Sequence, residues 1–252
     1  MASSVAGGDL GTRGFLDREP DPLRYSAATR QPNEATGMLC DRIPLGARVL
    51  DVGCGTGSIS ALLASECHAT LVGIEPNPER ADACRTRGLN VENGYYDEET
   101  ATRLGAFDVI VFADVLEHVS DPASLLELAS RHLTPNGIVL VSTPNVAHWT
   151  VRTALLRGHF DYQPMGIMDA THLRWFTSRT IRRVFESVGL DVVDHDWTSG
   201  SWMQSYRHVP RSLRRNGVRA LVRTLPDLFG CQHIVTGAPR NSAARTAFQK
   251  SA

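Results

Sequence analysis

Short apolar segments alternate with amphipathic ones along most of this chain, and this alternation constrains its fold more than any other feature. From residue 48 onward, apolar runs long enough for one buried strand are separated by segments with helical spacing. Continuous apolar strands are typical of a parallel sheet covered by helices on both faces. The predicted strands are residues 48–53, 70–75, 89–94, 107–114, 137–144, 190–197 and 231–238.

Segments with helical spacing lie between these strands, and several carry the start and stop signals of helices. The segment 76–88 begins with prolines and ends in glycine, and 120–133 opens with serine, aspartate and proline. Right-handed crossovers between such elements give a doubly wound α/β fold with a mostly parallel seven-stranded sheet. The remaining predicted helices are 58–66, 178–189 and a basic amphipathic helix near 209–225.

The length of 252 residues suits one large domain or two small ones. We expect a flexible N-terminal segment over residues 1–20, followed by a single domain over residues 21–252. No apolar run reaches the roughly 18 residues of a membrane span. The N-terminus also lacks the charged start and apolar block of a secretory signal. These features predict a cytoplasmic location and no membrane partner.

The five cysteines are widely spaced and form no CxxC pair, which argues against a zinc site and against a disulfide scaffold. We therefore expect five buried thiols and no metal ion. The cysteines are Cys40, Cys54, Cys67, Cys84 and Cys231.

The charge distribution gives no indication of a nucleic-acid partner. The net charge is −1, so no overall field attracts a polyanion. The chain between Arg207 and Arg245 nevertheless carries eight arginines and one acid, Asp227. We interpret this basic end as a solvated face that could meet an anionic substrate or a second subunit, as in a homodimer.

The first predicted strand runs into the segment DVGCGTGS, where Gly53, Gly55 and Gly57 occupy every second position. Glycine lets the backbone pass close to a ligand where a Cβ would collide, and the next helix offers free N–H groups at its start. The second strand ends in Glu75, a carboxylate suited to a ribose diol. A tight turn without a ligand is the alternative, but this context favours a nucleoside site.

Four segments resemble, in order and spacing, the successive motifs of class I S-adenosylmethionine-dependent methyltransferases, in particular the small-molecule type 11/12 superfamily. The segments are VLDVGCGTGS, GIEPNPE, FDVIVFADVLEHVSDP and GIVLVSTPN. The resemblance covers about residues 35–200. It implies a Rossmann-like methyltransferase fold, S-adenosyl-L-methionine as the cofactor, and a lid insertion after the fifth strand at about 145–176.

The resemblance also implies which residues bind the cofactor. Asp51 would support the glycine loop and the ligand's amino group, Glu75 would bind both ribose hydroxyls, and Asp114 would lie near the methionine end. Pro76 would flank the adenine, and Asp97 would meet its amino group. The complete set is Asp51, Gly53, Gly55, Gly57, Glu75, Pro76, Asp97 and Asp114.

A hydroxyl or ammonium acceptor needs a base, although alignment does most of the work of methyl transfer. The candidate bases are His118, which follows the fourth strand, and His148 and His172, which lie in the insertion. A helix-start histidine that only orders the loop is the alternative for His118.

The segment MDATHLRWFT, Met168–Thr177, is predicted to close the acceptor side of the pocket. Asp169 is near enough in sequence to pair with His172. Arg174 could hold a carboxylate or phosphate. Trp175 could wall the acceptor site or pack the insertion on the core.

The insertion resembles bacterial methyltransferases of polysaccharide and secondary-metabolite pathways, and also methionine-biosynthesis methyltransferase-like proteins. The first interpretation is methyl transfer to a hydroxyl oxygen of a sugar-like or secondary-metabolite acceptor. A nitrogen acceptor would need the same site. A cofactor-binding accessory protein that acts through a partner enzyme is a further alternative. A nucleic-acid methyltransferase is disfavoured, because ADVLEH stands where a DPPY or NPPY stacking element would.

Overall fold

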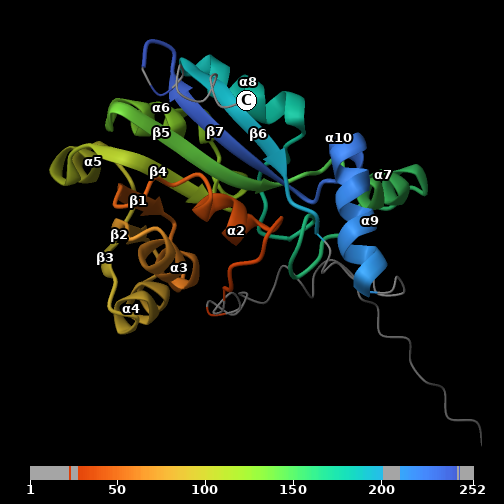
Figure 1. Cartoon of the computed structure of the whole chain (residues 1–252), viewed down its shortest axis with the longest axis horizontal. Helices are drawn as coiled ribbons and strands as arrows, with labels where there is room; N and C mark the ends of the chain where they lie inside the picture. The colour runs from red at the N-terminus through yellow and green to blue at the C-terminus, as the bar shows by residue number, and fades with distance from the viewer. Residues whose placement is uncertain (1–22, 24–27, 201–210, 243, 245–252) are drawn as a thin grey trace, which may run out of the picture.

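In a computed structural model that describes residues 23, 28–200, 211–242 and 244, the seven predicted strands form one sheet (Figure 1). The strand order is β3-β2-β1-β4-β5-β7-β6. The predicted flexible segment, residues 1–20, lies outside the described residues. The strands are β1 (Arg48–Val52), β2 (Thr70–Glu75), β3 (Asn90–Asn93), β4 (Phe107–Ala113), β5 (Leu133–Pro144), β6 (Leu190–Trp197) and β7 (Gln232–Pro239).

The sheet is parallel except at β7, which runs antiparallel to both of its neighbours, β5 and β6. This confirms the predicted mostly parallel, doubly wound sheet. The strand order reverses between β1 and β4, and open α/β sheets bind ligands at the carboxyl ends of the strands beside such a reversal. The fold therefore places the loops after β1 and β4 together.

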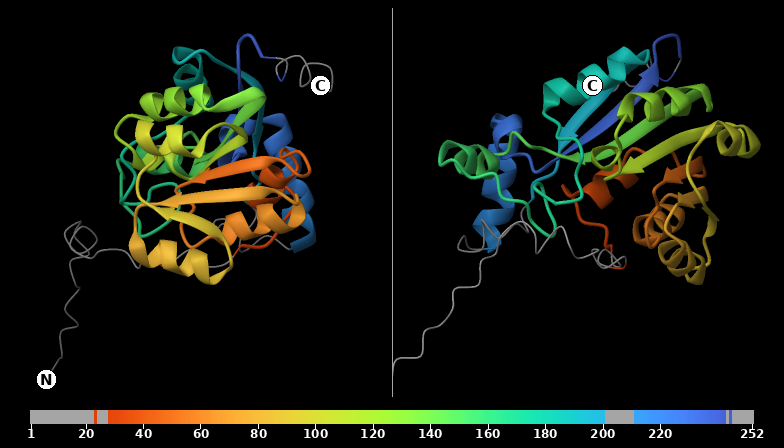
Figure 2. Two further views of the ribbon diagram at one scale, coloured as in Figure 1. Left: turned by 90° about the vertical axis from the view of Figure 1, so that its left-hand side faces the viewer. Right: turned by 180° about the vertical axis from the view of Figure 1, so that it is seen from behind.

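Helices cover both faces of the sheet (Figure 1 and Figure 2), and every strand except the edge strand β3 supplies apolar side chains to both layers. In β1, Leu50 and Val52 enter the core beneath α6 and α8, while Val49 enters the core beneath α2 and α3. Because neighbouring side chains point to opposite faces, a strand buried on both sides is apolar at nearly every position. The covering helices are α2 (Ala35–Cys40), α3 (Ser58–Glu66), α4 (Pro78–Thr86), α5 (Glu98–Leu104), α6 (Pro122–Arg131) and α8 (Ser178–Ser187).

Some helices could not be recognised in the sequence, because they bury too few side chains to leave a periodic apolar stripe. The only buried residue of α5 is Ala101, and the only one of α7 (Trp149–Leu156) is Val151. The basic helix predicted near 209–225 is confirmed as α9 (Arg211–Thr224), and the short α10 (Pro226–Phe229) follows it. No helix among the described residues is long and apolar enough to cross a membrane.

The insertion at 145–176 is more ordered than a loop. It contains α7, and its two ends are joined by a bridge between Asn145 and Phe176. Ile167 and Met168 are buried within it. The first half of the insertion is helical, since His148 caps the start of α7. The prediction of five buried free thiols is confirmed.

Two fully buried histidines make the fold sensitive to acid. Burial lowers the pKa of His148 to about 4 and that of His233 to about 3, from 6.5. These histidines therefore bind protons in the unfolded chain that they do not bind in the native chain. Their contribution to the stability of the fold is lost as the pH falls from about 6.5 toward 4.

We expect acidification from pH 7 to pH 5 to lower the melting temperature of the parent protein more, or to raise it less, than that of the His233→Gln variant. Calorimetric scans across this range measure both slopes. Buried carboxylates contribute a slope of opposite sign, but equally in both proteins, so the difference isolates His233. Equal slopes would contradict the assignment.

Candidate active site

The glycine loop after β1 has the left-handed backbone that only glycine adopts without strain, with φ values of 72° at Gly53, 59° at Gly55 and 75° at Gly57. A Cβ added to Gly53 would lie 2.7 Å from Val115, and one added to Gly57 would lie 2.4 Å from the Cys84 sulfur. At Gly55 it would meet nothing within 4 Å. Two glycines therefore serve packing within the protein, and Gly55 is the one that faces open space.

Glu75 lies beside this loop, as predicted, and is buried. Its Oε2 accepts a hydrogen bond from the Gly55 N–H at 2.8 Å, and its Oε1 accepts one from the Asn77 N–H at 2.9 Å. Each carboxylate oxygen has a second lone pair, so the group can still accept hydrogen bonds from a vicinal diol. Asn77 itself caps α4 by accepting from the Arg80 N–H, and Pro76 is exposed next to Glu75.

Asp51 is a buried carboxylate in which only one of the two oxygens accepts a hydrogen bond from a described residue. Its Oδ2 accepts a hydrogen bond from the Ser60 hydroxyl at 2.5 Å, while Oδ1 has no partner among the described residues. Burial raises the pKa of Asp51 to about 7, and the nearby Glu75 charge adds to the shift. A cationic amino group is the partner that such an orphaned oxygen lacks, so the site fits the ammonium of S-adenosylmethionine.

Asp97 and Asp114 differ in how they are held. Asp97 is exposed and caps α5 by accepting from the Thr100 N–H at 2.9 Å, so its contact with adenine stays a prediction. Asp114 follows β4 with a φ of 55°, and its Oδ1 accepts from Ser142 at 3.0 Å and Gln232 at 2.9 Å. Burial raises the pKa of Asp114.

A second cluster, Glu117–His118–His172, joins the turn after β4 to the insertion. The His118 and His172 rings meet edge to face with their centroids 4.8 Å apart. One ligand-type atom from each of the three residues lies within 4.8 Å of the others. Such a group can share protons, and it also has the composition of a divalent metal site.

The two imidazoles are oriented by backbone carbonyls. His118 Nδ1 lies 3.2 Å from the Thr171 carbonyl oxygen, and His172 Nδ1 lies 3.1 Å from the Ile167 carbonyl oxygen. Because a carbonyl can only accept, Nδ1 donates in both rings, and a neutral ring then carries its lone pair on Nε2. The arrangement fixes Nε2 as the basic nitrogen of each ring.

Glu117 stands behind the histidines and is almost fully buried. Its Oε2 accepts from the Thr143 hydroxyl at 3.0 Å, and its Oε1 has no partner among the described residues. Burial, reinforced by the Asp114 charge, raises its pKa well above the usual value. The sequence analysis missed Glu117, although it directly precedes His118 in the LEHV segment.

The backbone of the segment Met168–Thr177 is hydrogen-bonded to the turn that carries Glu117 and His118. The N–H groups of Leu173 and Arg174 donate to the Glu117 carbonyl at 2.7 and 3.0 Å. This docking brings His172 to His118 across more than fifty residues of sequence. That MDATHLRWFT closes the acceptor side of a pocket stays a prediction.

The other predicted residues of the insertion have different surroundings. The structure does not support His148 as a base, because it is fully buried, caps α7 and contacts the Thr150 hydroxyl at 2.8 Å. Arg174 does not reach into the site, since its guanidinium donates to the Ser120 and Leu173 carbonyls.

Asp169 and Trp175 are also held by the insertion itself. The Asp169 carboxylate accepts from the Thr171 N–H and hydroxyl at 2.9 and 2.7 Å, so it supports the residue that contacts His118. The Trp175 ring packs against Phe160 and Tyr162. Direct contact of either residue with an acceptor stays a prediction.

Comparisons with known proteins agree with this geometry. A family model described as a methyltransferase domain matches residues 24–195. The chain belongs to this methyltransferase family. Its fold is that of the class I methyltransferases. Membership of the family implies that its cofactor is S-adenosylmethionine.

Among its relatives, the ubiquinone biosynthesis O-methyltransferase of Xylella fastidiosa (strain 9a5c) is 38% identical over 112 residues. The match covers 41% of this chain and 45% of that enzyme, so it spans less than half of the relative's length. A chain of the solved Haloferax volcanii complex between the Trm112 methyltransferase activator and a methyltransferase is similar over 81% of this chain and 88% of that one. Its TM-score is 0.57 at 19% identity.

The solved [4+2]-cyclase SpnF has a TM-score of 0.54 at 21% identity, with 82% of this chain and 80% of that one covered. These structural likenesses show the fold. They do not fix the chemistry, since one fold supports many reactions.

The role of Glu75 can be tested by binding. We expect Glu75→Ala to weaken S-adenosylhomocysteine binding by about 1.5–3 kcal/mol, roughly 10- to 150-fold in Kd, because hydrogen bonds to a charged group are lost. Isothermal titration measures the change. Asp82→Ala, on the exposed face of α4, is the matched control. Unchanged affinity in Glu75→Ala would contradict the assignment of Glu75 as the ligand of the ribose hydroxyls.

The role of Asp51 predicts a pH dependence. Its raised pKa means that the unliganded carboxyl is increasingly protonated below about pH 7. A ligand ammonium needs the carboxylate, so S-adenosylhomocysteine affinity should fall as the pH drops from 8 to 6, by up to about tenfold per unit below 7. Asp51→Asn should bind weakly with little pH dependence. An equal pH dependence in this variant would assign the effect to another group.

Proposed function

We propose that this protein transfers the methyl group of S-adenosylmethionine to a hydroxyl oxygen of a small polar acceptor. The observation that carries the proposal is the Glu117–His118–His172 cluster, which provides basic nitrogens beside the turn that packs on the glycine loop. The relatives named as O-methyltransferases favour oxygen over nitrogen. Sugar-like and secondary-metabolite hydroxyls are the acceptor classes to test first, and phenols are a further class of hydroxyl to include.

The residues of the chain have three tasks in this reaction. When bound, S-adenosylmethionine supplies a methyl group that its sulfonium has already activated. Glu75 and Asp51 hold the ribose and the amino group, which fixes where the methyl group points. The His118–His172 pair accepts the acceptor's hydroxyl proton at Nε2 as the new O–C bond forms. The buried Glu117 carboxyl stabilises the resulting imidazolium, which gives that orphaned group the cation it lacks.

A second candidate function rests on the exposed apolar surface of the insertion. Five of the ten large apolar side chains that are exposed in the described residues lie between 155 and 173. Their concentration on this short segment suits a protein that binds the cofactor and acts by association with a partner enzyme. This alternative predicts cofactor binding without turnover on any acceptor. The five are Leu155, Leu156, Phe160, Met165 and Leu173.

The base assignment is tested with His118→Asn and His172→Asn. We expect both variants to bind S-adenosylhomocysteine as the parent protein does, and to lose about 100-fold or more in kcat, the usual contribution of a positioned base. His159→Asn, an exposed histidine of the same insertion, is the control. Release of S-adenosylhomocysteine in the presence of hydroxylated sugars, phenols and amines measures turnover.

Two outcomes would overturn this assignment. Loss of cofactor binding in step with activity would make the histidines structural. Activity that a chelator abolishes and a divalent metal restores would make the cluster a metal site instead of a base.

A further inference from the structure

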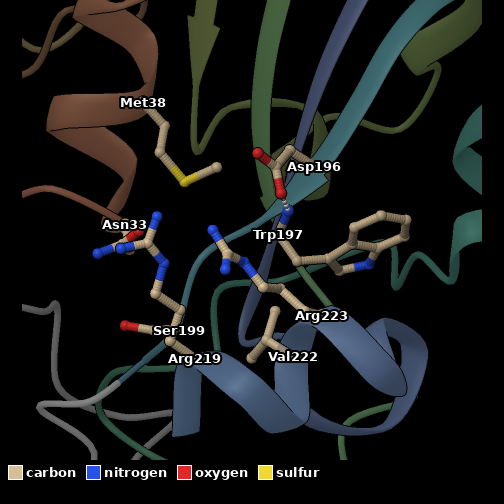
Figure 3. A pocket seen from close by; sticks show the side chains of 8 residues that line it. All are labelled: Asn33, Met38, Asp196, Trp197, Ser199, Arg219, Val222 and Arg223. Carbon is tan, nitrogen blue, oxygen red and sulfur yellow. Dashed lines mark hydrogen bonds between the residues drawn. The ribbon is translucent and has the colours of Figure 1, made fainter. Parts of the chain in front are cut away.

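A cavity of about 100 Å³ lies between α2, the carboxyl end of β6 and α9, outside the residues described so far (Figure 3). It is too small for a whole metabolite, since ligand pockets usually have roughly 300–1,000 Å³. It has room for one small polar group. The lining residues that matter are Asn33, Ser199, Arg219 and Arg223, with Met38 and Val222 as apolar walls.

Two positive charges face this cavity without a visible counterion. Arg219 and Arg223 lie four residues apart on α9, and Figure 3 shows both guanidinium groups extending toward Asn33 and Met38. Within the described part of the chain, neither guanidinium pairs with a carboxylate. Like charges at this helical spacing repel each other, so the pair is stabilised when an anion binds between them.

The nearby acids are already engaged. Asp196 lines the cavity, but its Oδ2 lies 3.3 Å from the Arg42 guanidinium and its Oδ1 accepts from the Trp197 N–H at 2.8 Å. Glu34 accepts from the Ser199 hydroxyl at 2.7 Å and does not line the cavity. The two arginines therefore give the cavity a net positive charge.

The cavity lies at the edge of the sheet where the strands that carry the candidate active site end. Since β5 and β6 are both antiparallel to β7, β6 runs parallel to β5 and ends at the same edge as β1 and β4. Gln232 connects the two places, because its N–H donates to the Thr198 hydroxyl at 3.1 Å and its side chain donates to Asp114 at 2.9 Å. Figure 1 shows α9 beyond the strand ends, on the side of α2.

We propose that Arg219 and Arg223 bind a carboxylate or phosphate group of the methyl acceptor, so that the preferred acceptors are anionic. Planar guanidinium groups bind both kinds of oxyanion through paired hydrogen bonds. The anionic group anchors in the cavity while the hydroxyl that is to be methylated reaches toward Asp114 and the histidine pair. The inference rests on the proposed function for the role of the ligand, but the anion site can be measured without turnover.

The first test uses binding of inorganic phosphate to the full chain saturated with S-adenosylhomocysteine. We expect saturable binding that weakens at least about tenfold in the Arg219→Gln/Arg223→Gln variant, since hydrogen bonds to charged groups are lost. The control is Arg179→Gln/Arg183→Gln, an exposed pair with the same spacing on α8. No phosphate binding, or equal weakening in both double variants, would overturn the site.

The second test separates the acceptor from the other sources of an oxyanion. S-Adenosylhomocysteine affinity should be unchanged in Arg219→Gln/Arg223→Gln; a parallel loss would assign the arginines to the cofactor's own carboxylate and overturn the proposal. In the parent protein, 3,4-dihydroxybenzoate should compete with phosphate and catechol should not. The same comparison is made with glucose 6-phosphate and glucose. Phosphate binding without competition by either anionic compound would mark a free-anion site and overturn the acceptor assignment.

Failure of the proposed function has a different signature. If neither compound is methylated but the anionic one still displaces phosphate from the arginine pair, the anion site stands and methyl transfer is the part that fails. If acceptors are methylated equally with and without an anionic group, methyl transfer stands and the arginine assignment fails.

Discussion

The close packing of Gly53 on Val115 brings the two halves of the candidate site together. A side chain at Gly53 would overlap the Val115 methyl groups, so only glycine lets the loop after β1 rest on the turn after β4. The Gly53 and Cys54 N–H groups both donate to the Ile74 carbonyl, which ties that loop to the end of β2. Glu75, Asp114 and the turn that carries Glu117 and His118 lie at the carboxyl ends of neighbouring parallel strands, and this contact without room for a Cβ lets their loops pack together.

Three carboxyl groups with raised pKa values line this edge: Asp51, Asp114 and Glu117. Burial of a carboxylate without a cation is costly, so these groups weaken the native state at neutral pH. The two-sided apolar core beneath them offsets that cost. A cofactor ammonium at Asp51 and an imidazolium at Glu117 would each supply a missing positive charge. A bound ligand and an imidazolium would thus each relieve a cost that the protein bears without them.

The histidines show how far local sequence can be interpreted. His148 and His172 lie in the same insertion, and nothing within either segment distinguishes a base from a helix cap. Both side chains are buried, and the structure distinguishes them by their partners, because His148 caps α7 whereas His172 meets His118. The same holds for Arg174. Its guanidinium donates hydrogen bonds to the Leu173 and Ser120 carbonyls, and its position in the sequence does not reveal these partners.

The sequence by itself determined the seven strands of a doubly wound sheet, the glycine loop and the placement of Glu75. Each depends on local rules: apolar runs buried on two faces, glycine at left-handed φ, and an acid at the end of the next strand. Tertiary structure alone decided that Glu117, His118 and His172 form one cluster, and that Arg219 and Arg223 face a cavity beside Asn33 and Ser199. These groups come from segments far apart in the chain. Their meeting depends on how the insertion and α9 dock, which no local pattern encodes.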